Sequence, residues 1–126
     1  MNSKIFFFGW LIAIAVASLI NYSAIGGLDL SSDFGSGFYL HIIGYFIAGA
    51  LYLLAFGNKY KKSVIIAFLV LFMLGVLFEF VQKYIPSRTF NPNDMAANGL
   101  GLVGVYVCRK LIVRIPSRTH IDNHIN

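Results

Sequence analysis

The sequence predicts an all-α fold, a polytopic membrane protein in which four transmembrane helices form a single domain over residues 1–126. Hydrophobic residues make up 58% of the chain and charged residues only 12%, whereas roughly a quarter of the residues in a typical soluble domain are charged. The mean hydropathy of +0.75 agrees with this. Four long apolar stretches, separated by short polar segments, have about the length that crosses a bilayer. This composition excludes an ordinary soluble domain.

The first apolar stretch, residues 5–20, follows Lys4. Such a start is typical of a membrane helix or of a secretory signal peptide, and the A-V-A sequence at 15–17 would be an acceptable cleavage site. We predict an uncleaved first helix, because three further spans follow and Trp10 interrupts the apolar run. Residues 21–37 are rich in glycine and serine, which predicts a loop.

Three further spans are predicted at residues 38–56, 63–83 and about 94–113. A basic turn separates the first two of these, and a loop with two prolines separates the last two. The spans at 38–56 and 94–113 carry small residues four apart, which allow helix backbones to approach closely in a membrane. These small residues are Gly44 and Ala48, and Ala97 and Gly101. We therefore expect the fourth helix to be the central one.

The charged residues predict the orientation in the membrane. Eight of the ten basic residues fall on one side of the predicted bundle, together with Asp122: they are Lys4, Lys59, Lys61, Lys62, Arg109, Lys110, Arg114 and Arg118. Lys83 and Arg88 fall on the other side with the four remaining acidic residues. Because positive residues remain in the cytoplasm, both termini are expected there, in a multi-pass protein of the cell membrane. The net charge of +5 then needs no nucleic-acid partner, and membrane lipids are the expected partners.

Seven polar side chains are expected to meet at the outer face: His41, Tyr45, Glu79, Gln82, Arg88, Asp94 and Asn98. Within each helix they are three or four residues apart and so share a face. A carboxylate and an imidazole can act as general acid and base, and a guanidinium suits a phosphate or carboxylate. We predict catalytic roles for His41, Glu79 and Asp94. Substrate-binding roles are predicted for Tyr45, Gln82, Arg88 and Asn98.

Structural roles are the alternative for the charged members of this set. Asp94 or Asn93 could cap the fourth helix. Glu79 could form an ion pair with Arg88 or Lys83 that holds the loop in place. Either role would account for the residues without any chemistry.

The remaining members have similar alternatives. His41 could donate a hydrogen bond to a backbone carbonyl, and Gln82 and Asn98 could link helices. One histidine and two carboxylates could hold a divalent ion, but the predicted spans have no His-x-x-x-His motif and no carboxylate pair at ligand spacing. His120 and His124 are four residues apart, but they lie in the polar C-terminal tail on the other face, where we expect them to be solvated. No metal site is therefore predicted, and no cofactor is identified.

The polar pattern resembles that of the VanZ-like family over about residues 38–107. The matching residues are Glu79-x-x-Gln82, Pro86-x-Arg88 and Asp94-x-x-x-Asn98 followed by Gly101, with His41-x-x-x-Tyr45 upstream. Many family members carry an acidic residue four positions before the histidine, often followed by a lysine. This chain departs from that pattern, because it has Gly37 and Phe38 there.

The resemblance implies a VanZ-like transmembrane domain and a link to low-level glycopeptide (teicoplanin) resistance. The family has been related to membrane enzymes that exchange or cleave phosphate-linked lipid headgroups, phosphatidylserine synthases among them. The function expected from the resemblance is therefore action on a phospholipid or a polyprenyl-linked envelope intermediate. A non-enzymatic module that binds a lipid headgroup, a drug or a partner subunit is the alternative.

Overall fold

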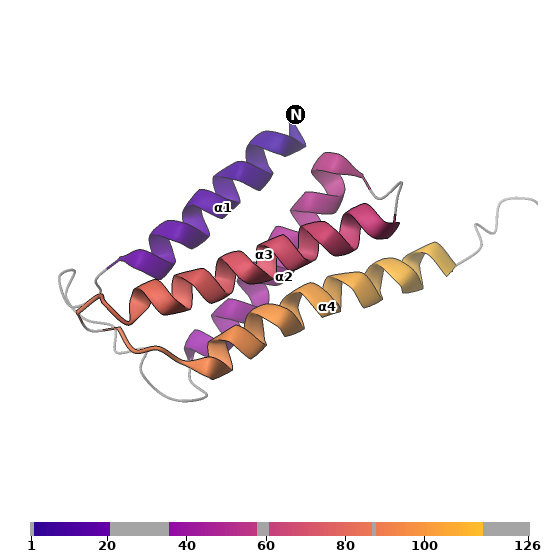
Figure 1. Cartoon of the computed structure of the whole chain (residues 1–126). Helices are drawn as coiled ribbons and strands as arrows, with labels where there is room; N and C mark the ends of the chain where they lie inside the picture. Colours follow the sequence, from indigo (N-terminus) through magenta and orange to yellow (C-terminus); the bar gives the residue numbers. More distant parts are fainter. Residues whose placement is uncertain (1, 21–35, 58–60, 87, 115–126) are drawn as a thin grey trace, which may run out of the picture.

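A computed structural model describes residues 2–20, 36–57, 61–86 and 88–114. These residues form four α-helices and no strand: α1 (Ser3–Leu19), α2 (Ser36–Phe56), α3 (Lys61–Gln82) and α4 (Pro92–Arg114) (Figure 1). The all-α prediction is confirmed for this part of the chain, and the helix bounds agree with the expected ones to within about two residues.

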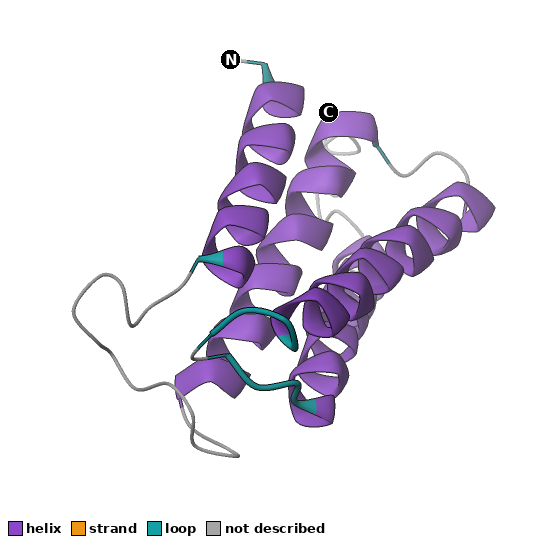
Figure 2. Ribbon diagram, turned by 60° about the vertical axis from the view of Figure 1, so that its left-hand side comes forward, coloured by secondary structure: helices purple, strands orange, loops and turns teal. Residues whose placement is uncertain are grey.

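The helices alternate in direction, so that four helix ends meet at one end of the bundle. Gln82, at the end of α3, donates a hydrogen bond from Nε2 to the carbonyl of Ser18 near the end of α1 (3.0 Å). At the opposite end, the hydroxyl of Ser3 lies 3.3 Å from the carbonyl of Leu54 in α2. The ends of α1 and α3 therefore lie beside the starts of α2 and α4; we call this the site end. The loop that joins α3 to α4 lies at the site end (teal in Figure 2).

Helix α2 makes the most extensive interfaces, first with α4 and then with α1. Among the described residues α1 and α4 make no contact, so the expectation that the fourth helix is central is wrong. The small residues explain the error. Gly101 does bring α4 close to α2, since a Cβ built on it would lie 2.4 Å from the carbonyl oxygen of Ile42, but this close approach joins only two of the helices.

Helix ends follow the local sequence. Gly57 adopts a left-handed conformation (φ 72°) and its amide donates to the carbonyl of Leu53 (2.9 Å), which ends α2. Helix α3 gives way to turns at residues 83–86, where Pro86 disfavours helical geometry in the residue before it.

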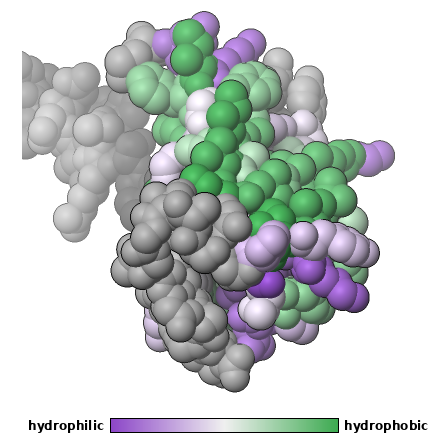
Figure 3. Space-filling view, turned by 90° about the vertical axis from the view of Figure 1, so that its left-hand side faces the viewer, coloured by the Kyte–Doolittle hydropathy of each residue, from purple (hydrophilic) through white to green (hydrophobic). Residues whose placement is uncertain are grey.

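The surface of the described helices is more apolar than that of a soluble protein. Glu79, Gln82 and Asn98 are buried, whereas large hydrophobic side chains are exposed on all four helices. The exposed ones include Phe8, Ile12 and Val16 on α1, Leu40, Ile43 and Leu54 on α2, Leu69, Met73 and Leu77 on α3, and Leu100, Val103 and Val107 on α4. In Figure 3, which shows the site end, hydrophilic residues gather low on the face and hydrophobic residues lie above them.

Two helices contain stretches long and apolar enough to cross a membrane, Gly37–Phe56 in α2 and Lys62–Gln82 in α3. Helix α1 is also apolar but has only 17 residues. Helix α4 carries the polar residues Asn93, Asp94 and Asn98 in its first two turns.

Candidate functional site

The first turn of α4 positions Asp94. Asn91 caps the helix, because its side-chain Oδ1 accepts a hydrogen bond from the amide of Asn93 (3.0 Å). Pro92 occupies the first helical position, where an N–H group is not needed. The interpretation of Asp94 or Asn93 as the cap is therefore wrong, and the carboxylate of Asp94 points instead toward His41. Negative charge in this turn is favoured by the helix dipole.

His41 lies between two carboxylates from two other helices. Its Nε2 atom is 3.8 Å from Oε1 of Glu79 and 3.8 Å from Oδ2 of Asp94. The side chains of His41 and Asp94 are 19% and 16% exposed, and that of Glu79 is fully buried. One nitrogen or oxygen atom from each residue lies within 4.8 Å of the others. We call these three residues, one each from α2, α3 and α4, the His41 cluster.

Asn98 fixes the orientation of the imidazole. Nδ1 of His41 lies 2.8 Å from Oδ1 of Asn98. Because an amide oxygen only accepts hydrogen bonds, Nδ1 donates the proton in this contact, and Nε2 faces the two carboxylates. Asn98 is itself buried, one turn after Asp94 on α4.

Gly75 of α3 makes room for this arrangement. A Cβ built on Gly75 would lie 2.6 Å from Nδ2 of Asn98 and 2.6 Å from the hydroxyl of Tyr45. Any side chain here would displace one of these two groups. Tyr45 is buried, one turn after His41 on α2.

Glu79 has unequal surroundings at its two oxygens. Oε2 accepts a hydrogen bond from the backbone amide of Asn91 (3.4 Å), at the start of α4. Oε1 has no hydrogen-bond partner among the described residues, and the same holds for Oδ1 of Asp94. A buried carboxylate oxygen without a partner is costly, so Oε1 is available for a proton, a ligand or a cation.

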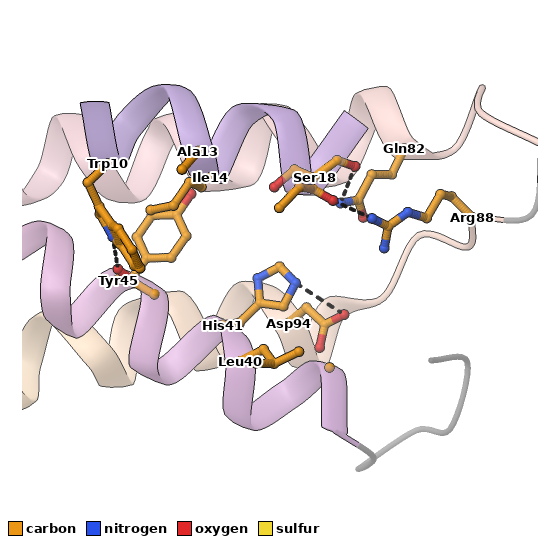
Figure 4. Close-up of a pocket in the computed structure, with 13 residues that line it drawn as sticks. Trp10, Ala13, Ile14, Ser18, Leu40, His41, Tyr45, Gln82, Arg88 and Asp94 are labelled. Carbon is orange, nitrogen blue, oxygen red and sulfur yellow. Dashed lines mark hydrogen bonds and ion pairs between the residues drawn. The ribbon is translucent and has the colours of Figure 1, made fainter. Parts of the chain in front are cut away.

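A cavity of about 300 Å³ lies beside the cluster. Helix α1 contributes Trp10, Ala13, Ile14, Ala17 and Ser18 to its wall, α2 contributes Gly37, Leu40, His41, Gly44 and Tyr45, and Gln82, Arg88 and Asp94 complete it. In Figure 4, His41 and Asp94 point toward each other on one side of this cavity, and Gln82 and Arg88 extend toward α1 on the other. The cavity therefore joins a mainly apolar wall to a polar end.

Gln82 and Arg88 hold the end of α1. The last carbonyls of a helix lack partners within the helix, and here the Gln82 side chain donates to Ser18 O (3.0 Å) and Nε of Arg88 donates to Ile20 O (3.4 Å). Nη2 of Arg88 also donates to the carbonyl of Ala17. A cation is favoured at a helix C-terminus. Gln82 therefore links α3 to α1, which is the structural alternative considered for it above. Arg88 links the loop before α4 to the end of α1.

All seven residues singled out from the sequence lie in the half of the bundle nearer the site end, with Tyr45 close to the middle of α2. His41, Glu79 and Asp94 form the cluster, Asn98 holds His41, and Tyr45 lies beside Asn98. Gln82 and Arg88 line the far side of the cavity, where they also anchor α1.

Several further residues of the site were not predicted from the sequence: Trp10, Ala13, Ala17 and Ser18 of α1, Gly75 of α3, and Asn91 before α4. Trp10, Ala13 and Ala17 are three and four residues apart and therefore share one helix face. This spacing could have identified the α1 side of the site from the sequence. The pair Asn91-Pro92 is a typical helix start and would have identified the cap.

Comparison of the chain with models of protein families, with curated proteins and with solved structures gives no match. The chemistry of the site therefore rests on its own geometry and on the pattern of its residues.

Proposed function

We propose that this chain is a VanZ-like integral membrane protein with four membrane-spanning helices, and that the His41 cluster acts on phosphate-linked lipid headgroups or polyprenyl-linked envelope intermediates at the outer face. The proposal rests on one observation. An imidazole and two carboxylates from three helices lie close together beside a cavity that Arg88 also lines. The family's link to glycopeptide resistance supplies the physiological setting.

The apolar surface supports four spans. Large hydrophobic side chains are exposed on α1 and α4 as well as on α2 and α3, and such a surface is stable only against lipid or a partner. The ends away from the site carry the basic residues Lys4, Lys62, Arg109 and Lys110, so the positive-inside rule favours cytoplasmic termini and an outward-facing site.

Reporter fusions test this orientation. Fusions after Asn58 and after Asn126 should report a cytoplasmic position, and a fusion after Arg88 should report the outside, because the loops alternate between the two faces. Paired alkaline phosphatase and fluorescent protein reporters give opposite signals on the two sides and control for expression. A cytoplasmic signal from the Arg88 fusion would turn the site inward and remove the envelope substrates.

The proposed chemistry uses the two sides of the cavity. The guanidinium of Arg88 holds a phosphate oxygen, while Trp10, Ile14 and Leu40 contact the start of an acyl or prenyl chain. A hydroxyl group, from water or from an acceptor alcohol, attacks the phosphorus and transfers its proton to Glu79 or His41. The departing headgroup oxygen then receives a proton from the same pair. Asp94 and Asn98 orient the imidazole, and Gln82 positions Arg88 and α1.

The direct experiment uses purified protein in detergent or nanodiscs with radiolabelled phospholipids and polyprenyl phosphates. Release or exchange of the headgroup, lost in the His41→Ala variant, is the expected result. The anchoring of α1 by Gln82 and Arg88 favours a second candidate, a module that binds the same headgroups without turnover. Binding without product in the wild type, little changed in Glu79→Gln, would identify that module and reject the enzyme.

A further inference from the structure

The centre of the His41 cluster brings three electron-rich atoms together. The Asn98 side chain engages Nδ1 of His41, and Nε2 faces Oε1 of Glu79 and Oδ2 of Asp94, each at 3.8 Å. This distance is too long for a hydrogen bond. The contacts are therefore repulsive unless a positive charge lies between the three atoms.

The separations suit a shared metal ion. Nitrogen and oxygen ligands lie roughly 2.0–2.2 Å from Zn²⁺, so two ligands of one such ion are at most roughly 4.4 Å apart. One ligand atom from each of the three residues lies within 4.8 Å of the other two, which is close to this limit. Small side-chain movements would bring all of them into coordination distance.

Two further observations point to a cation. Glu79 is fully buried, and its Oε1 has no hydrogen-bond partner in the described parts of the chain although it is directed into the cluster. The other nitrogen of His41 is held by the Asn98 side chain, as the second nitrogen of a metal-binding histidine is usually held. A divalent ion would also balance the charges of the two carboxylates.

We propose that Nε2 of His41, Oε1 of Glu79 and Oδ2 of Asp94 bind one divalent transition-metal ion, Mn²⁺ or Zn²⁺. Imidazole favours zinc and its neighbours in the transition series, and carboxylates favour manganese, so a mixed set selects these ions over Ca²⁺. Three protein ligands leave a coordination position for a further ligand, as in catalytic sites. Only the role of the ion, polarising a lipid phosphate, rests on the proposed function; its binding does not. With the ion bound, Nε2 of His41 is a ligand, so Glu79 alone takes the proton of the attacking hydroxyl group.

Metal binding can be measured without any lipid. Untagged full-length protein in detergent is stripped with EDTA, freed of the chelator and titrated with MnCl₂ or ZnCl₂, followed by electron paramagnetic resonance for Mn²⁺ and calorimetry for Zn²⁺. We expect one ion per chain. Glu79→Gln and His41→Gln should each weaken binding by more than 100-fold, and Asn98→Ala, which removes only the support of His41, by about 10- to 100-fold.

The chain supplies a matched control. Its two other histidines, His120 and His124, are four residues apart in the C-terminal tail and could bind metal adventitiously. The double variant His120→Ala/His124→Ala should keep the full affinity and the one-to-one stoichiometry. Asp94→Asn, at a partly exposed position in a first helical turn, provides a third ligand variant if either buried replacement fails to fold.

Three outcomes would overturn the metal site: no stoichiometric binding by the wild type, wild-type affinity in the ligand variants, or loss of binding in the tail variant alone. The first of these would assign the positive charge to a proton on Nε2 instead. Headgroup turnover that persists in EDTA rejects the metal but keeps the proposed enzyme. One-to-one binding without turnover keeps the metal and rejects the enzyme.

Discussion

Replacing Glu79 with glutamine is expected to lower headgroup turnover by at least 100-fold while the protein inserts and accumulates normally. Glutamine has the shape of glutamate, but it neither takes up a proton during turnover nor supplies an anionic ligand. General acid–base catalysis contributes about 10²- to 10⁴-fold, which sets the size of the loss. Because Glu79 is fully buried, the neutral side chain should also leave the thermal unfolding midpoint unchanged or higher. Turnover of labelled lipid and thermal unfolding in detergent measure the two effects.

Lys83→Ala is the matched control, since Lys83 lies one turn after Glu79 and its side chain is exposed. This variant should keep wild-type turnover. His41→Ala, Asp94→Asn and Arg88→Ala should each reduce turnover in the same direction as Glu79→Gln. Normal turnover in both Glu79→Gln and Arg88→Ala would contradict the proposed site.

Lower activity together with unchanged or higher stability in Glu79→Gln would show that the carboxylate serves catalysis and not the stability of the fold. A carboxylate kept only for packing or for an ion pair would destabilise the fold when it is neutralised, because its partner would be left buried and unpaired. A carboxylate kept for chemistry has the opposite effect on stability. Glu79→Gln therefore distinguishes the structural alternative from the catalytic one in a single variant.

The helices could be predicted because their signals are local. Long apolar runs between polar segments fix where a helix begins and ends, as in α3, which ends just before Pro86. The site could be predicted in outline because a carboxylate such as Glu79 is expensive in an apolar helix and needs a partner or a task. Alternating directions then bring the polar ends of α2, α3 and α4 together.

The partners of each polar residue could not be predicted, because they depend on which helix faces pack together. Arg88 donates to carbonyls of α1, about 70 positions earlier in the chain, and nothing in the local sequence signals this contact. The proposed metal site could not be predicted for a related reason. Residue spacing within one stretch does not reveal it, because His41, Glu79 and Asp94 come from three separate helices.

Gly101→Ala is expected to destabilise the bundle, because Gly101 lies where α4 crosses α2 most closely. The added Cβ would lie 2.4 Å from the carbonyl oxygen of Ile42 and 2.9 Å from the backbone nitrogen of Phe46. Backbone atoms cannot rotate away, so the two helices must separate. Overpacking of this kind costs about 1–3 kcal/mol, which exceeds the roughly 0.5–1 kcal/mol that alanine gains over glycine within a helix. A lower thermal unfolding midpoint, followed through the fluorescence of Trp10, measures the loss.

Gly44→Ala is the matched control on the partner helix. A Cβ built on Gly44 meets no atom of the described residues within 4 Å, so only the gain in helix propensity remains and the unfolding midpoint should stay the same or rise. Because His41 and Tyr45 lie on the stretch of α2 that Gly101 contacts, Gly101→Ala should also reduce turnover. Equal midpoints for the two alanine variants would show that α2 and α4 do not pack through Gly101, and the cluster that this interface positions would have to be assembled differently.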